Sequence, residues 1–240
     1  MKKVFGSIFF AVFSAFSLLF FGEKIGSNLK HSSYSASACF FNKYSSNGAE
    51  YNAKDIDSID ISWIGGEVNI LESEKDVLFF KEDSHGKELS ENQKLHWCIE
   101  KGKSGKGKLI IEPEDPSISN KWSWWKKSLP KKDLTVYVPK NLERVSLNIV
   151  GSVCDFKEST AKKICLSGVG GSLNLAPLNC DKVSVNGTSL DLNIKLNDTA
   201  GYTVCRDGVF DGLIGKDEKV YGDGKIKISL EGVKCRLKTL

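Results

Sequence analysis

The chain has 240 residues, of which 40% are hydrophobic and 27% are charged, and its formal net charge is +4. This length accommodates one well-buried domain together with a targeting segment. The mild positive charge does not by itself support nucleic-acid binding, and 22 glycines with a single methionine favour a turn-rich all-β chain over a helical one.

Residues 1–26 are predicted to be a signal anchor or signal peptide. Lys2 and Lys3 precede a nearly uncharged apolar run from Val4 to Phe21. The run has about the minimum length for a membrane-spanning helix and is long for the core of a signal peptide. Because lysines stay on the cytoplasmic side, everything after Gly22 is expected outside the cell membrane. We therefore predict a single-pass membrane protein with an extracytoplasmic C-terminal domain.

Three fates of this segment fit the sequence. Ala36-Ser37-Ala38 has the small-x-small form of a cleavage site, and Cys39 follows it as in a lipoprotein. However, the apolar run ends about 15 residues earlier, whereas signal peptidase cleaves just past the hydrophobic region. An uncleaved anchor is therefore favoured, and a secreted or lipid-anchored protein is the alternative.

Residues 27–55 are predicted to be a flexible tether, because most of the segment is rich in Ser, Asn and Ala and shows no sustained period. The folded domain is expected to span residues 56–240. Its first stretch, IDISWIGGEVNIL, places two alternating strands around Gly65-Gly66. A buried strand, a hairpin (LHWCIEK and KLIIEPED) and a strand ended by Pro139 (LTVYVP) are expected next.

From Val145 onward, five units repeat the order strand, glycine-containing turn, strand. They read VSLNIVGSVCDF, ICLSGVGGSLNL, VSVNGTSLDLNI, TVCRDGVFDGLI and IKISLEGVKCRL. If Val153, Leu173, Leu190, Val209 and Val233 are equivalent, the spacing is roughly 17–24 residues. Because each unit buries only one side, stacked copies are needed to form a continuous apolar column. The prediction is an all-β, β-helix-like β-solenoid, with a β-sandwich as the alternative.

Glycines are expected to form the turns of these units. They are Gly66, Gly151, Gly171, Gly187, Gly208 and Gly232. In particular, Asn186-Gly187 and Asp207-Gly208 are expected to supply positive φ where the chain bends.

Two stretches resemble a known family. LTVYVPKNLERVSLNIVGSV looks like the lead-in to the core of the DUF4097 adhesin family, and YGDGKIKISLEGVKCRL is similar to its closing element. The resemblance covers residues 56–240 and implies a β-helical domain of the bacterial cell envelope, often behind a transmembrane segment, with no established enzymatic residues. The chain departs from the family in replacing the usual Ser-Gly turn and in carrying a Trp/Lys insertion.

That insertion, here called the Trp/Lys loop, is the predicted contact site. It comprises Lys121, Trp122, Trp124, Trp125, Lys126 and Lys127. Tryptophan prefers the bilayer interface, and lysine is attracted to anionic head groups. The loop is interpreted as a cap over the solenoid, a contact with envelope lipid, or a platform that stacks on a glycan or another ligand. The extracytoplasmic address disfavours stacking on single-stranded nucleic acid.

The seven cysteines give no predicted metal or redox site. They lie at positions 39, 98, 154, 165, 180, 205 and 235, and no CxxC pair occurs among them. Cys165 and Cys205 occupy non-adjacent repeats, which places them beyond disulfide distance. We interpret the cysteines of the repeats as small buried hydrophobic residues, and leave their redox state open.

No catalytic, metal or cofactor site is predicted. The histidines fit neither an HExxH motif nor a nucleophile elbow; they are His31, His85 and His96. Asp55, Asp57 and Asp60 lack the glycine-containing loop and later glutamate of an EF-hand, so a solvated strand edge is expected.

These features predict a non-enzymatic adhesin-like module, or a stress-accessory protein, that binds components of the cell envelope. The alternatives are a structural partner of a membrane signalling system and an enzyme acting on envelope polysaccharide. The expected partners are the membrane, through the N-terminal segment, and an envelope lipid, glycan or protein, but not nucleic acid.

Overall fold

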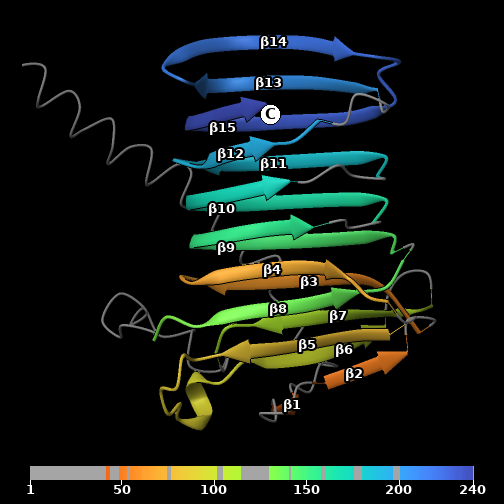
Figure 1. Ribbon diagram of the computed structural model, residues 1–240, viewed down its shortest axis with the longest axis vertical. Coiled ribbons are helices and arrows are strands. Elements are labelled where there is room, and N and C mark those ends of the chain that lie inside the picture. The colour runs from red at the N-terminus through yellow and green to blue at the C-terminus, as the bar shows by residue number, and fades with distance from the viewer. Residues whose placement is uncertain are drawn as a thin grey trace, which may run out of the picture. The chain divides into compact units, whose positions relative to one another are not determined.

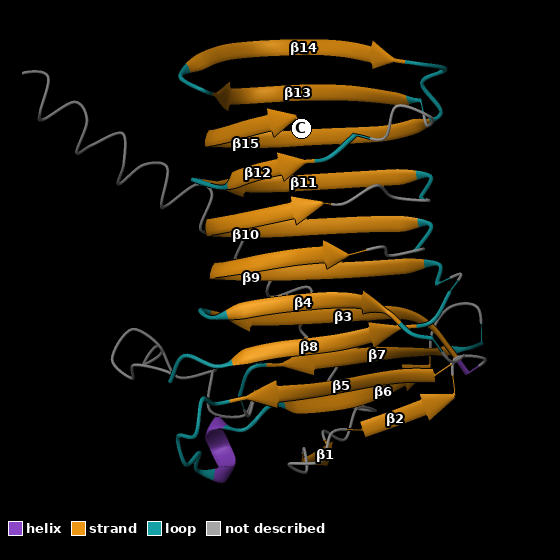
Figure 2. Ribbon diagram, viewed as in Figure 1, coloured by secondary structure: helices purple, strands orange, loops and turns teal. Residues whose placement is uncertain are grey.

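The computed structural model describes residues 42–43, 49–52, 55–74, 77–101, 105–114, 130–140, 142–157, 161–175, 180–196 and 201–239. All of them belong to one compact unit, residues 40–240. They form strands connected by loops, with a short 3-10 helix, η2 (Glu91–Gln93) (Figure 2). The all-β prediction is therefore confirmed. The predicted signal anchor lies outside the described residues, and within them no helix has the length and apolar character needed to cross a membrane.

The strands are β1 (Asn42–Lys43), β2 (Ala49–Asn52), β3 (Ile56–Ile64), β4 (Glu67–Glu72), β5 (Val77–Asp83), β6 (His96–Lys101), β7 (Gly107–Glu112), β8 (Asp133–Val138), β9 (Arg144–Lys157), β10 (Lys163–Leu175), β11 (Lys182–Thr188), β12 (Asp191–Ile194), β13 (Tyr202–Phe210), β14 (Leu213–Tyr221) and β15 (Ile226–Thr239).

Parallel pairing arranges most of these strands in two ladders (Figure 1). The first ladder runs in the order β7, β3, β9, β10, β11, β15, β13. The second ladder runs β8, β4, β9, β10, β12, β15. Strands β9, β10 and β15 appear in both because each bends, so that its two halves belong to different ladders. Antiparallel strands flank this stack, with β5 and β6 near one end and β14 at the other.

Three successive strands of the first ladder keep one offset. Lys163 of β10 pairs with both Arg144 of β9 and Lys182 of β11, so each of these strands is offset from the next by 19 residues. The second ladder keeps the same offset, because Ser172 pairs with both Val153 and Asp191. The two halves of each of these units therefore have the same offset from the corresponding halves of the next unit.

This register corrects the equivalence assumed between repeats. Val153 pairs with Ser172, whereas Leu173 pairs with Cys154, so Val153 and Leu173 are not equivalent positions. Position along a strand decides which side a residue faces, and a shift of one residue moves it to the opposite face.

The spatial order of the repeats also differs from their order in the sequence. The fourth unit, TVCRDGVFDGLI, contributes β13 and the start of β14, which form an antiparallel hairpin. Strand β15 lies between β11 and β13 and pairs in parallel with both. The last unit in the sequence therefore follows the third unit in space, and the hairpin extends the first ladder beyond it.

The core lies between the two ladders, which run one behind the other in Figure 1. Alternate residues of each strand point inward, and those of both ladders belong to one buried hydrophobic cluster. Full burial of such an aliphatic or aromatic side chain contributes about 1.5–3 kcal/mol to folding. Fully buried members include Ile61, Trp63, Val68, Ile70, Leu147, Cys154, Ile164, Leu173, Val183, Leu190 and Ile228.

At the bend between the ladders, the equivalent residue of five units has a left-handed backbone. Its φ is 65° at Gly65, 63° at Gly151, 63° at Gly170, 57° at Ser189 and 55° at Lys234. Glycine adopts this conformation without the steric conflict that a Cβ atom causes. The bend is thus repeated in these five units, although two of them carry a residue poorly suited to it.

Four of the six predicted turn glycines have positive φ: Gly66 (64°), Gly151 (63°), Gly171 (104°) and Gly208 (128°). Gly187 and Gly232 do not, and the prediction that they form turns is wrong. Both lie inside strands and pair with each other.

Close packing, rather than a turn, explains the glycines at 187 and 232. A Cβ atom on Gly187 would collide with the Leu190 side chain, and one on Gly232 would lie 2.6 Å from Sγ of Cys235. Each unit bends two residues after the glycine, at Ser189 or Lys234, and the next side chain folds back over the strand. The glycine leaves room for that side chain.

Strand pairing begins earlier in the chain than predicted. Strand β1 pairs with β6 and β2 pairs with β5, and both β1 and β2 lie in the range 27–55 expected to be a tether. The folded part therefore begins before Ile56.

Candidate functional site

A row of four positive charges crosses the outer face of the first ladder. Lys163 pairs with Arg144 and Lys182, and Lys182 pairs in turn with Lys227, so the four residues occupy one register position on β9, β10, β11 and β15. All four are exposed. Adjacent strands lie about 4.7–4.9 Å apart, which sets the spacing between successive members. We call these four residues the basic row.

The basic row has no ion-pair partner among the described residues. Among the ion pairs of the described residues, none involves Arg144, Lys163, Lys182 or Lys227. Like charges directly opposite one another on adjacent strands destabilise a sheet. Four in succession therefore carry an electrostatic cost that an anionic ligand would remove.

A row of small polar residues runs beside the basic row. It lies two residues further along each strand, on the same face, and consists of Ser146, Cys165, Ser184 and Ser229. These residues are half-buried. The hydroxyl groups of the three serines both donate and accept hydrogen bonds, so the outer face combines positive charge with neutral groups able to bind an oxygen-rich ligand.

The sequence carries a local signal for the basic row. In four units a basic residue directly precedes the first strand core, in RVSL, KICL, KVSV and KISL. Recognising it requires the strand register, because only the parallel pairing of these strands places the four charges side by side.

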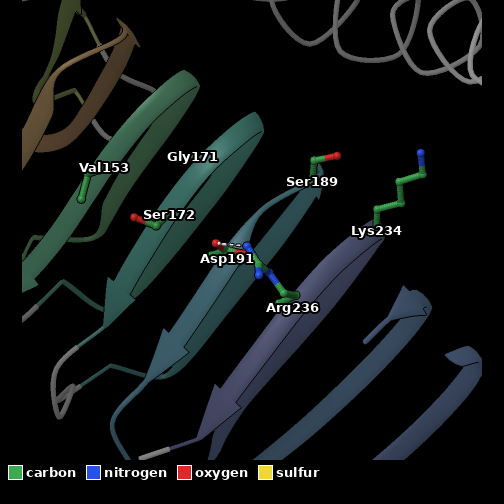
Figure 3. Close-up of a pocket in the computed structure, with 7 residues that line it drawn as sticks. All are labelled: Val153, Gly171, Ser172, Ser189, Asp191, Lys234 and Arg236. Atoms are coloured by element: carbon green, nitrogen blue, oxygen red, sulfur yellow. Dashed lines mark hydrogen bonds and ion pairs between the residues drawn. The ribbon is translucent and has the colours of Figure 1, made fainter. Parts of the chain in front are cut away.

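A second candidate is an open depression of about 590 Å³ at the bend between the ladders (Figure 3). Its lining includes Ser172, Ser189, Asp191, Lys234 and Arg236. The guanidinium group of Arg236 donates two hydrogen bonds of 2.6 Å to the carboxylate of Asp191. This carboxylate raises the pKa of Arg236 and neutralises its charge. The depression therefore offers less net charge to a ligand than the basic row.

On the outer face of the second ladder, Asp155, Asn174 and Asn193 form a polar row. The amide of Asn174 donates to Asp155, and the amide of Asn193 donates to Oδ1 of Asn174 at 2.8 Å. An enzyme acting on polysaccharide would need carboxylates clustered on adjacent strands. This row supplies one carboxylate, which is engaged by an amide.

The histidines and aspartates considered in the sequence do not form a common site. Nε2 of His85 lies 3.0 Å from Oδ2 of Asp133, and buried His96 is held through Nδ1, 2.9 Å from the carbonyl oxygen of Lys94. Asp57 accepts a hydrogen bond from Ser58, and Asp60 forms an ion pair with Lys108. Within the described ranges, no group of three or more His, Cys, Asp or Glu is arranged to hold a metal ion. His31 lies outside those ranges.

Five of the described cysteines are free. Cys154, Cys180 and Cys235 are buried, as predicted, whereas Cys165 and Cys205 are half-buried on the outer face. Burial raises the pKa of the Cys154 and Cys180 thiols to about 12. Because the thiolate is the reactive form, Cys154 and Cys180 are chemically inert at neutral pH.

The Trp/Lys loop, Lys121 to Lys127, lies outside the described residues. Lys132, in the basic stretch that follows the loop, is 2% exposed and is therefore buried. Its ammonium nitrogen lies 2.7 Å from Glu82 and donates to the carbonyl oxygens of Gln93 and Pro113. Lys132 is therefore a buried residue of the fold and is not available to a ligand.

Comparisons with known proteins support the fold. No protein-family model matches the chain, and no curated protein matches it. Among solved structures, the chain is similar to a crystal structure described as that of a putative cell adhesion protein from Clostridium sporogenes ATCC 15579, with a TM-score of 0.52 and 14% identity. The similarity covers 80% of this chain and 100% of the other. At this level of identity it concerns the fold alone.

Proposed function

We propose that this protein is a non-enzymatic, adhesin-like module of the bacterial cell envelope that binds a linear anionic polymer along the basic row. The observation that carries the proposal is the alignment of Arg144, Lys163, Lys182 and Lys227, which have no ion-pair partner in the part of the chain that the structure describes. Similarity of fold to a protein described as a cell adhesion protein favours a binding role.

The geometry of the row favours a polymer over a small anion. The four charges follow the axis of the stack, so a chain of phosphate or carboxylate groups lying across the strands meets one cation per strand. Phosphate and carboxylate both accept charge-assisted hydrogen bonds from Lys and Arg. Exposed charges attract such a chain over one Debye length, about 8–10 Å, and added salt screens the attraction.

The proposal includes the location and architecture expected from the sequence. The N-terminal segment tethers the domain to the membrane, and the domain faces the outside. The parallel stack is a short β-solenoid of the DUF4097 type. The 19-residue offset repeated from β9 to β10 and from β10 to β11 and β12 supports this architecture, because a repeated offset is what stacked units of one length produce.

The binding test uses the full chain in non-ionic detergent with three probes: long-chain polyphosphate, polygalacturonate and neutral dextran. We expect binding to one or both anionic polymers, weakening with salt, and none to dextran. Preference between the two distinguishes a phosphate from a carboxylate polymer. The variant Lys163→Glu/Lys182→Glu should bind at least tenfold more weakly.

The matched control is Lys87→Glu/Lys195→Glu, which makes the same change in net charge at exposed lysines outside the row. It should retain most of the affinity. Equal losses in both double variants would attribute binding to net charge and contradict the proposal. Equally tight binding of a single-stranded oligonucleotide would point to nucleic acid instead.

A further inference from the structure

Strand β14 is an open edge at one end of the stack (Figure 1). Among the described residues it pairs only with β13, and β13 and β14 extend beyond the last strand of the second ladder. Its apolar side chains are nonetheless exposed: Leu213 is 78%, Ile214 86%, Val220 61% and Tyr221 37% exposed. Folded proteins usually protect a sheet edge, because unpaired backbone groups and apolar side chains invite another strand.

The two faces of β14 are fixed by its pairing with β13. Tyr221 lies opposite Tyr202 and Leu213 opposite Phe210, so the odd-numbered residues share the face of buried β13 side chains. Residues 214, 216, 218 and 220 lie on the outer face, which is also the face of the basic row. A second strand that continues the sheet has to keep this alternation.

The sequence of β14, LIGKDEKVY, is complementary to itself when two copies run antiparallel about Asp217. In that register Lys216 of one copy lies opposite Glu218 of the other, and Ile214 lies opposite Val220. Because of the two-fold symmetry, each of these two pairs occurs twice in the dimer. Opposite charges and apolar pairs directly across two strands both stabilise a sheet.

In this register only Asp217 lies opposite the same residue of the other copy. Its negative charge is already compensated by Arg206 of its own chain. Nε of Arg206 donates to Oδ1 of Asp217 at 2.6 Å, and the guanidinium group forms a second bond to Oδ2. A shift by two residues would place Lys216 opposite Lys216 or Glu218 opposite Glu218. A shift by one residue would bring the outer face of one copy against the inner face of the other.

We propose that two copies of this chain associate through antiparallel pairing of their β14 strands, with a two-fold axis at Asp217 perpendicular to the sheet. The contact is isologous, as in most symmetric dimers. It extends the sheet from one copy into the other and covers both edges. The pairing stands independently of the proposed ligand.

The dimer has one consequence that does rest on the proposed function. A two-fold axis perpendicular to the sheet keeps both outer faces on the same side, so the two basic rows point in the same direction. A polymer long enough to reach both rows binds the dimer more tightly than either copy alone, because the second contact is intramolecular.

Register-specific cross-linking tests the pairing. Full chains carrying Ile214→Cys are mixed with chains carrying Val220→Cys and oxidised gently. Directly opposite residues in an antiparallel pair have Cα atoms about 4.5–5.5 Å apart, within disulfide range. We expect a cross-linked dimer in the mixture and little in either variant alone, where the cysteines lie six residues apart along the strand. Absence of that dimer, or equal yields in all three samples, would overturn the proposal.

Charge exchange provides a second test, read by sedimentation of the full chain in detergent. The wild-type chain should contain a dimer, and Glu218→Lys should dissociate it by placing a lysine opposite Lys216. The double variant Lys216→Glu/Glu218→Lys should restore it. A monomeric wild-type chain, or a double variant as monomeric as Glu218→Lys, would count against pairing in this register. Binding of short polyphosphate by Glu218→Lys should stay intact, which separates failure of the dimer from failure of the basic row.

Discussion

The ammonium nitrogen of Lys132 lies 2.7 Å from Oε2 of Glu82, and both side chains are at most 5% exposed. The same ammonium lies 5.2 Å from the ring centre of Trp63, whose indole N–H donates to the backbone carbonyl of Lys132. Burial lowers the pKa of Lys132, and the charge of Glu82 opposes that shift. This buried ion pair connects β5 to the residue just before β8.

Replacing Lys132 with methionine should destabilise the fold strongly. The change leaves the carboxylate of Glu82 buried without its cation and removes the donor to two carbonyl groups, and loss of one partner of such a pair costs about 3–5 kcal/mol. The urea midpoint of unfolding measures the effect. Lys131→Met, at an exposed neighbour, is the control. Recovery of part of the loss in Lys132→Met/Glu82→Gln would confirm that the unpaired charge is the cause.

Glycine in place of Ser189 or Lys234, at the bend between the ladders, should increase the stability of the fold. Both residues have a left-handed backbone that costs a non-glycine residue about 1–2 kcal/mol, partly offset by the greater entropy of glycine in the unfolded chain. We expect Ser189→Gly to raise stability by up to about 1 kcal/mol.

The opposite change at the same bend should lower stability. Gly151→Ala and Gly170→Ala place a Cβ atom where nothing lies within 4 Å, so only the backbone conformation opposes them. A loss of about 1 kcal/mol is expected for each. Thermal unfolding of the variants measures both directions, and a neutral Gly151→Ala would mean that the bend tolerates a side chain freely.

Stability should decline in alkaline solution in part because of Cys154. Its thiol has a pKa of about 12 in the folded protein and about 8.5 when unfolded, so the folded state retains the proton over this interval. The contribution is fully present below about pH 8.5 and is lost as pH rises towards 12, by up to about 1.4 kcal/mol per pH unit. Urea unfolding between pH 8 and 10 should show a steeper decline in the wild type than in Cys154→Ala. Cys165→Ala, which removes a half-buried thiol and leaves Cys154 in place, is the control.

Loss of the disulfide at Cys98 should destabilise the fold. Cys98 is disulfide-bonded, and the other five described cysteines are free. Cys98→Ala should cost about 2–4 kcal/mol. The urea midpoint of unfolding measures the effect, and a reductant should lower the midpoint of the wild type but not that of Cys98→Ala.

Only part of the candidate site could be predicted from the sequence. The basic residues of the RVSL and KICL stretches are visible in the sequence, but their side-by-side placement depends on the parallel register of β9 and β10. The burial of Lys132 was equally hidden, because its partners Glu82 and Gln93 are distant in the chain. Contacts between residues far apart in the chain produce no local sequence pattern from which they could be predicted.

The sequence by itself determined that the domain is all-β, because alternation of apolar residues and frequent glycines are local properties that each strand and turn carries alone. It did not determine which strands are neighbours. Strand β15 lies between β11 and β13 although it follows both in the chain, and Gly187 and Gly232 meet inside the sheet rather than at turns. Register and order are set by packing between strands, and that packing aligns the charges of the basic row and leaves β14 at the edge.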